Sequence, residues 1–253
     1  MKSFSAREDL FKLSSLQIPP AFLILCTTIP SWLQLWKIYL ILNRIAIYFK
    51  HRMAAVGKIY CLMGKSASGK DTVYRRLLGE KDMNLKKVIP YTTRPMRAGE
   101  QDGDSYFFCS EEEADQAMKE GRVLEMRTYH TICGVWKYFT EDDGQIDLSG
   151  SENYLMIGTP EACRKLRDCF GKENVEPICL ELEDRMRLER ALRREQSQPQ
   201  PNYRELCRRY LADEEDFSPQ KLEEADVRKK FDNSDLEETI REISDYIRSR
   251  REQ

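Results

Sequence analysis

Residues 59–72 read IYCLMGKSASGKDT, and the fold prediction starts from this segment. The apolar run from Ile59 to Met63 is short enough for a buried strand, and it leads through a loop of small residues into a helix. The spacing matches G-x-x-x-x-G-K, in which the glycines let backbone N–H groups face phosphate oxygens and the lysine reaches the terminal phosphates. The segment predicts a P-loop whose ATP-binding residues are Gly64, Lys65, Ser66, Ala67, Ser68, Gly69, Lys70, Asp71 and Thr72.

Asp71 stands where a P-loop carries a serine or threonine whose hydroxyl binds Mg²⁺. A carboxylate can ligate the metal directly or through water, whereas without the metal it repels phosphate. Asp71 is therefore the candidate metal ligand, and Mg²⁺ with ATP is the predicted cofactor. The competing interpretation is a glycine- and serine-rich turn without a ligand, which the lysine, both glycines and the strand–loop–helix context disfavour.

The composition is that of a globular protein with enough chain for one α/β domain and some excess. Of 253 residues, 33% are charged and 41% are apolar, and the net charge of −2 does not support a protein that coats nucleic acid. Eight cysteines without a C-x-x-C pair indicate a reducing cytoplasm, and His51 and His130 alone cannot complete a zinc site of ordinary spacing. We expect no nucleic-acid partner and no structural metal.

The segment from Ile18 to Phe49 is far more apolar than the rest of the chain. A clean transmembrane span is disfavoured because four residues interrupt the run, namely Pro30, Gln34, Lys37 and Arg44. A signal peptide is disfavoured, because no cleavage site of small residues precedes the domain.

Two interpretations of residues 1–52 stay open. Polar residues at helical spacing favour a helix that lies on a membrane surface, with residues 18–52 in contact with it. Alternatively, translation begins at Met53, because residues 53–58 lead directly into the first strand. On either interpretation the chemistry belongs to residues 53–253. We expect a cytoplasmic protein, associated with a membrane if residues 1–52 are translated.

The other elements are predicted from periodicity and end signals. We expect strands at residues 85–89, 122–126, 153–157 and 178–182 and near Phe231. Expected helices are 72–78 ending at Gly79, one from Ser110 to Gly121 with Ser110 and Glu113 as capping box, and one from Thr159 to Gly171. Arginine-rich helices follow Asp184 and are broken at residues 197–202, and a last helix is capped by Ser234 and Glu237. Alternating strands and helices predict an α/β fold with a mostly parallel sheet flanked by helices, and ligands at the carboxyl ends of its strands.

The order of these motifs resembles the guanylate kinases over about residues 57–248. The most specific part is the block Thr92–Phe108, TTRPMRAGEQDGDSYFF, which follows the P-loop and precedes an arginine-rich lid and an N-x-D-L sequence at Asn233. The resemblance implies a P-loop NTPase fold with a small acceptor-binding insert at about residues 90–140 and a lid at about 190–209. It implies transfer of the γ-phosphoryl group of ATP to a nucleoside monophosphate, with GMP the leading acceptor.

The candidate acceptor-binding residues come first from the block after the P-loop. Arg94 and Arg97 offer two planar cations to the phosphate of the acceptor, and Tyr106 offers a hydroxyl donor. The resemblance adds Glu125, whose counterpart in the family hydrogen-bonds the edge of guanine.

The lid residues are matched through the resemblance as well. Arg190, Arg194 and Arg209 match the cations that close over ATP and neutralise charge as the phosphoryl group moves. Asn233 matches a residue on the adenine side. The predicted catalytic set is therefore Lys70, Arg94, Arg190, Arg194 and Arg209. His130, within an aromatic segment that runs to Tyr138, is given no catalytic role, because this chemistry needs no strong base.

Three positions mark the chain as a divergent member of the family. The base-reading positions of the family fall here on Pro90, on Met156-Ile157-Gly158 and on Cys133-Gly134-Val135. Since unmatched buried polar groups supply most base discrimination, we expect a preference for GMP of about tenfold or less.

Two alternatives for the activity stay open. Ribose bisphosphate phosphokinases are similar in having Asp after the P-loop lysine and no acidic pair at the third strand, which makes a phosphorylated sugar such as ribose 1,5-bisphosphate an alternative acceptor. The other is a non-catalytic guanylate kinase-like module that binds a protein, which the intact Gly69-Lys70 disfavours.

Overall fold

The computed structural model describes residues 38, 42, 57–97, 99–131 and 134–251. The chain divides into two compact units, Met1–Asn43 and Arg44–Gln253, and every element below lies in the second. Apart from Ile38 and Leu42, the expected N-terminal extension and its boundary at Met53 lie outside the described residues. None of the helices found among the described residues is long and apolar enough to cross a membrane.

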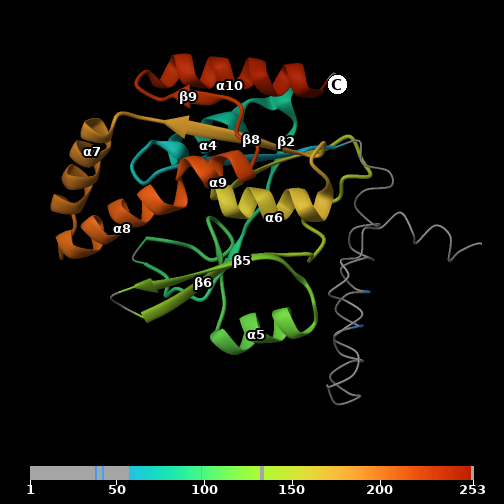
Figure 1. Cartoon of the computed structure of the whole chain (residues 1–253), viewed down its shortest axis with the longest axis horizontal. Helices are drawn as coiled ribbons and strands as arrows, with labels where there is room; N and C mark the ends of the chain where they lie inside the picture. Colours follow the sequence, from blue (N-terminus) through green and yellow to red (C-terminus); the bar gives the residue numbers. More distant parts are fainter. Residues whose placement is uncertain (1–37, 39–41, 43–56, 98, 132–133, 252–253) are drawn as a thin grey trace, which may run out of the picture. The chain divides into compact units, whose positions relative to one another are not determined.

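The strands and helices alternate as the sequence indicates (Figure 1). The strands are β1 (Ile59–Gly64), β2 (Leu85–Lys87), β3 (Tyr91–Thr92), β4 (Phe107–Phe108), β5 (Val123–Thr131), β6 (Gly134–Glu141), β7 (Asn153–Ile157), β8 (Val175–Glu181) and β9 (Lys230–Asp232). The helices are α4 (Lys70–Gly79), the short 3-10 helix η2 (Lys81–Met83), α5 (Glu111–Lys119), α6 (Pro160–Phe170), α7 (Asp184–Gln196), α8 (Tyr203–Asp216), α9 (Pro219–Glu224) and α10 (Leu236–Arg251).

The main sheet has the strand order β2-β7-β1-β8-β9, and all of its neighbours are parallel. Parallel strands joined through helices bury both faces of the sheet, and this burial accounts for the completely buried strand β1. The predicted α/β fold with a mostly parallel sheet is confirmed, and the carboxyl end of β1 carries the P-loop.

Alternate residues of β1 enter two separate cores. Ile59 and Met63 pack with α6 and α9 on one face, whereas Tyr60 and Leu62 pack with α4 and α10 on the other. Figure 1 shows these two helical layers on either side of the sheet. Ile240, Ile243 and Ile247 of α10 turn inward as predicted.

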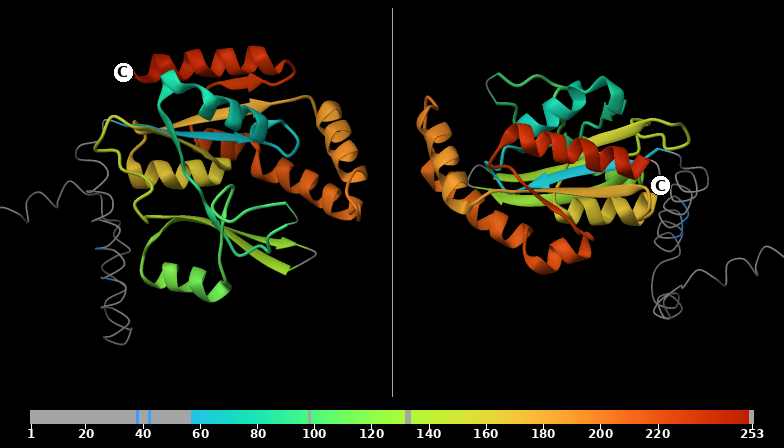
Figure 2. Two further views of the ribbon diagram at one scale, coloured as in Figure 1. Left: turned by 180° about the vertical axis from the view of Figure 1, so that it is seen from behind. Right: turned by 90° about the horizontal axis from the view of Figure 1, so that it is seen from above.

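A second sheet with the order β4-β3-β6-β5 forms the insert and lies on one side of the main sheet (Figure 2). Its core is the antiparallel hairpin of β5 and β6, in which Arg127 lies opposite Tyr138. The expected strand 122–126 extends to Thr131, and the strand β6 was not predicted. His130 lies exposed near the end of β5, and Ile132 and Cys133 lie outside the described residues.

Several end signals operate as predicted, and one was misplaced by a residue. Ser110 and Glu113 form a complete capping box on α5, and the Thr159 side chain accepts a hydrogen bond at the start of α6. The expected Ser234 cap of α10 is wrong, because the Asp235 carboxylate accepts from the Glu238 amide 3.0 Å away, while the Ser234 hydroxyl donates to Asp232. Gly79, expected as a C-cap, is the last residue of α4.

Candidate active site

The phosphate-binding loop runs from the end of β1 to the start of α4. Gly69 has φ 92° and Ala67 has φ 62°, the left-handed conformation that glycine adopts without strain. The carbonyl of Gly69 accepts from the amides of Thr72 and Val73, which begins the first turn of α4. The N-terminus of α4 therefore lies at the carboxyl edge of the sheet, where a helix dipole and open N–H groups favour an anion.

Asn233, on the loop after β9, lies directly against the P-loop. It is 3% exposed, and its Nδ2 donates to the Ser68 carbonyl at 2.6 Å. A side chain at Gly69 would collide with the amide of Asn233, so this contact requires glycine there. The first half of the chain and the last strand thus meet at the loop.

Lys70 and Asp71 occupy the first two positions of α4. Asp71 is exposed, and its charge is among the influences that raise the pKa of Tyr106, after burial and the nearby Tyr138. Within the part of the chain that the structure describes, no three His, Cys, Asp or Glu side chains are grouped to hold a metal ion.

Arg94 is held within its own motif. Its Nη1 and Nη2 each donate to one carboxylate oxygen of Glu100 at 2.9 Å, and Nη1 also donates to the Pro95 carbonyl. The guanidinium lies 5.5 Å from the ring centre of Tyr106 and 5.3 Å from that of Phe108. Arg94 is 4% exposed, so the block after the P-loop folds around this buried cation.

Arg97 and Tyr106 lie beside this buried pair. The Arg97 amide donates to Glu100 at 2.7 Å and the Arg97 side chain is exposed. Burial alone would raise the pKa of Glu100, but the hydrogen bonds from Arg94 and from the Arg97 amide hold it below the usual value. The structure thus brings together the three residues predicted to hold the acceptor phosphate.

Glu125 is completely enclosed, and its main partner was missed by the sequence reasoning. Arg127, two residues further on the same face of β5, donates through Nε at 3.1 Å and Nη2 at 3.2 Å, and the Thr140 hydroxyl donates at 3.0 Å. Burial opposes the charge of Arg127, but Glu125, Tyr129 and Tyr106 together raise the pKa of Arg127. The E-x-R spacing on an alternating strand was the available signal.

The predicted lid arginines lie on two helices beyond the carboxyl end of β8. Arg190 Nη1 lies 3.7 Å from the point that a Gly69 side chain would occupy, so it reaches the P-loop. Arg194 is exposed further along α7. Arg209 of α8 is paired with Glu195 at 3.4 Å and with Glu205 at 3.8 Å.

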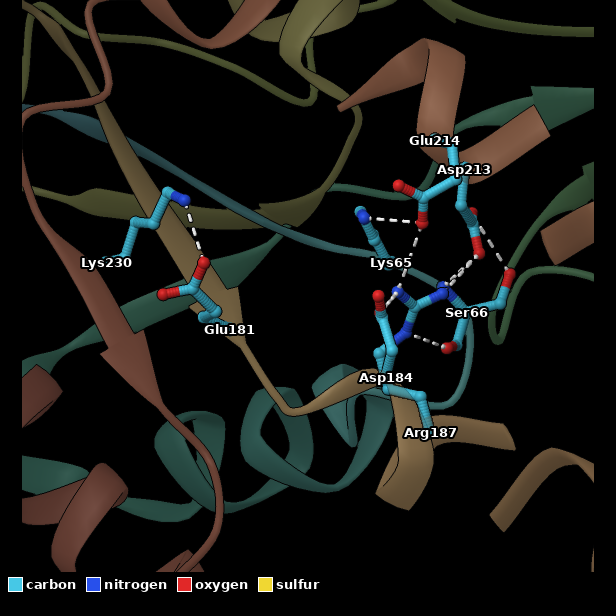
Figure 3. Close-up of polar contacts among 8 residues, drawn as sticks. All are labelled: Lys65, Ser66, Glu181, Asp184, Arg187, Asp213, Glu214 and Lys230. Atoms are coloured by element: carbon cyan, nitrogen blue, oxygen red, sulfur yellow. Dashed lines mark hydrogen bonds and ion pairs between the residues drawn. The ribbon is translucent and has the colours of Figure 1, made fainter. Parts of the chain in front are cut away.

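Two further lid residues contact the P-loop more closely than any of these, and sequence reasoning missed both. Arg187 of α7 is 2% exposed, and Asp213 of α8 accepts from Ser66 (Figure 3). Lys65 also pairs with Glu214 at 2.6 Å. Figure 3 shows Lys65, Ser66 and these acidic and basic side chains turned toward one another from three elements.

A cavity of about 300 Å³ flanks the P-loop where β8 ends. Its wall includes Lys65, Ser68, Phe217 and Leu222 and the ion pair of Lys230 with Glu181, 2.8 Å apart (Figure 3). Cationic and anionic side chains are balanced around it, so it lacks the strong positive field of a phosphate site.

Known proteins resemble this chain in sequence and in fold. The sequence profile described as guanylate kinase matches residues 56–138. The chain is 30% identical over 139 residues to the guanylate kinase of Malacoplasma penetrans, which covers 52% of this chain and 69% of that protein. It is 33% identical over 137 residues to the guanylate kinase of Caldanaerobacter subterraneus, covering 47% of this chain and 66% of the relative, just under two thirds.

The fold has a solved counterpart as well. The crystal structure of guanylate kinase from Anaplasma phagocytophilum superposes with a TM-score of 0.54 at 22% identity, over 79% of this chain and 88% of that one. At this identity the likeness concerns the fold, and the sequence matches carry the relationship. The chain belongs to the guanylate kinase family of nucleoside monophosphate kinases.

Proposed function

We propose that this protein transfers the γ-phosphoryl group of ATP to a nucleoside monophosphate, with GMP the leading acceptor. The observation that carries the proposal is that the P-loop follows the carboxyl end of β1 while the block Thr92–Phe108, here called the Arg94 block, follows the carboxyl end of β2 in the same parallel sheet. A donor phosphate on the loop and an acceptor phosphate at the block would then face each other, and phosphoryl transfer needs that alignment more than covalent chemistry.

Each predicted residue then has a part in the reaction. Lys70 and the loop amides would hold the β- and γ-phosphates, and Arg94, Arg97 and Tyr106 the phosphate of the acceptor. Arg190, close to Gly69, would neutralise charge on the transferred group, with Arg194 and Arg209 joining it when the lid closes. Asn233 would support the loop from the adenine side, through its bond to Ser68.

Mg²⁺ fits this site as a metal that comes with ATP. A magnesium ion keeps several waters and takes one or two carboxylates together with substrate phosphates, so a dedicated cage is not required. The exposed Asp71 carboxylate at the start of α4 would serve as the protein ligand. Bound there, the ion would neutralise charge on the phosphates and relieve their repulsion by Asp71.

A phosphorylated sugar is the second candidate acceptor, because Glu125 is already engaged. Both of its carboxylate oxygens accept from Arg127, and Oε1 also accepts from Thr140. A carboxylate with that many internal donors has less capacity left for the N–H groups of guanine. This favours weak base discrimination or an acceptor without a base.

The test is ATP consumption by the full chain with GMP, dGMP, AMP, CMP, UMP and ribose 1,5-bisphosphate, each alone. We expect turnover with GMP and at most about tenfold preference over the next nucleotide. Exclusive use of ribose 1,5-bisphosphate would select the second candidate. ATP consumption that no acceptor stimulates would leave the protein-binding module as the function. We place the protein in the reducing cytoplasm, because its eight cysteines include no C-x-x-C pair.

A further inference from the structure

The lid helices hold the backbone of Ser66 on both its donor and its acceptor side. The Ser66 amide donates to Asp213 Oδ2 at 2.8 Å, and the Ser66 hydroxyl donates to Asp213 Oδ1 at 3.2 Å. The Ser66 carbonyl accepts from Arg187 Nε at 3.2 Å. Arg187 Nη2 reaches Asp213 Oδ2 at 3.4 Å, so Ser66, Asp213 and Arg187 form a closed ring, the Ser66 ring (Figure 3).

Arg187 supplies the positive charge of this ring and is almost completely enclosed. Its side chain is 2% exposed, and Nη1 donates to Asp184 at 2.6 Å. The guanidinium carbon lies 5.0 Å from the ring centre of Tyr210 on α8. A buried arginine must be paired on every side to offset its lost hydration, and such a side chain is fixed in position. Arg185 on the same helix is 79% exposed, and among the described residues its ion pair is with Glu189.

The contact of Arg187 with Ser66 also fixes how α7, which follows β8, lies against the P-loop. Arg190 and Arg194 follow it by three and seven residues, which places all three on one side of the helix. The Nη1 of Arg190 lies 3.7 Å from the point that a side chain at Gly69 of the P-loop would occupy. Anchoring Arg187 to Ser66 therefore sets the distance between Arg190 and the phosphate-binding loop.

We propose that Arg187 and Asp213 are positioning residues that hold the lid in register with the P-loop for phosphoryl transfer, an inference that rests on the proposed function. Neither acts on the substrate. Asp213 and Arg187 fix the Ser66 peptide, and through α7 they place Arg190 where charge develops on the transferred group. A displacement of about 1 Å at such a site can lower the rate about a hundredfold, so the ring contributes to the rate rather than to the capture of the acceptor.

The test compares Arg187→Met with Arg185→Met in the full chain, by steady-state kinetics with ATP and GMP. Arg187→Met should lower kcat per folded molecule by about thirtyfold or more, and leave the KM of GMP within about threefold, because the Arg94 block is untouched. Arg185→Met should stay within about twofold of the unchanged protein in both constants. A kcat within about threefold for Arg187→Met, or a loss confined to the KM of GMP, would overturn the proposal.

Asp213→Asn supplies a second variant that keeps the shape of the ring. The amide oxygen still accepts from Ser66, but the charge opposite Arg187 is lost, so kcat should fall by about threefold to tenfold. The double variant with Arg187→Met should lose no more than Arg187→Met alone, because both act through one ring. Additive losses would overturn the proposal. If Arg187→Met does not fold, the kcat of Asp213→Asn tests the proposal by itself, and an unchanged kcat would overturn it.

A binding measurement separates this inference from the activity itself. ATP without acceptor is titrated calorimetrically into the unchanged protein and Asp213→Ala, and amide exchange is followed over residues 64–70. Asp213→Ala should weaken ATP binding by about fivefold or more and speed exchange of the Ser66 amide by about tenfold or more. Unchanged binding and exchange would overturn the inference, whereas absence of turnover in the unchanged protein would overturn the proposed function alone.

Discussion

The side chain of Arg94 makes a two-point contact with Glu100, with both nitrogen–oxygen distances at 2.9 Å. These residues are the third and ninth of the block TTRPMRAGE, so the motif closes on itself before any substrate binds. Such a pair presents Arg94 in one fixed orientation and lowers the entropy lost when a phosphate is bound. The same contact means that Arg94 supports the insert, besides its proposed role with the phosphate of the acceptor.

We therefore expect Arg94→Ala and Arg97→Ala to separate binding from stability. Each should raise the KM of the acceptor by about tenfold or more while changing the KM of ATP little, since a charged hydrogen bond contributes about 1.5–3 kcal/mol. Only Arg94→Ala should also lower the melting temperature, because Arg94 is buried and Arg97 is exposed. Equal effects on the KM of ATP and of the acceptor would place these arginines at the donor site.

Lys70→Ala should lower phosphoryl transfer by about a hundredfold or more without unfolding the protein. Lys70 begins α4 at the open edge of the sheet and is only partly buried, so its loss leaves the core unchanged. Turnover and thermal melting are measured on the same preparation. Retention of the original turnover by a folded Lys70→Ala protein would disprove the P-loop assignment.

Arg127→Met should destabilise the protein by about 3–5 kcal/mol, because it leaves the enclosed Glu125 carboxylate with the Thr140 hydroxyl alone. Urea unfolding gives the free energy of unfolding. The double variant Arg127→Met with Glu125→Gln should recover a large part of the stability that Arg127→Met loses. The control is Arg164→Met, which removes a surface pair with Asp168 and should cost less than about 1 kcal/mol. Similar losses for the two single variants would contradict the buried pair.

Asp213 gives the stability a defined pH dependence. Burial raises the pKa of Asp213 above its usual value, although the Ser66 hydrogen bonds, Arg187 and Lys70 oppose the shift. The folded state therefore binds this proton more tightly than the unfolded state, and the stability gained is complete at low pH and lost as the pH rises through the folded pKa. The unfolding free energy of the unchanged protein minus that of Asp213→Asn should decrease from about pH 4 to pH 7. A difference that increases over this range would refute the assignment.

The sequence predicted those parts of the fold that local signals determine. The P-loop depends on residues within six positions of one another, and the Ser110 capping box and the Thr159 cap on residues three positions apart. At α10 two adjacent candidates competed, and Asp235 became the cap because Asp232 takes the Ser234 hydroxyl. The strand β6 was missed because aromatic residues populate both of its faces, so its alternation of apolar and polar residues is weak.

The candidate site was predicted in its motifs and incompletely in its electrostatics. The arginine-rich helix α7 does not reveal from its sequence which arginine turns inward, because the partner of Arg187 lies 26 residues later, at Asp213. Glu125 was recognised by resemblance, but its pairing with Arg127 depends on how deeply these two side chains of β5 are buried. Burial and partners distant in sequence are properties of the packed chain, and local patterns do not specify them.

The most direct test of the central claim is the stoichiometry of the products formed from ATP, Mg²⁺ and GMP by the full chain, measured by chromatographic separation of the nucleotides. The proposed function predicts that ADP and GDP appear in equal amounts at matching rates, and that Lys70→Ala forms neither above background. ADP formed without any phosphorylated acceptor, or no ADP at all, would contradict the proposed transfer of phosphate to GMP.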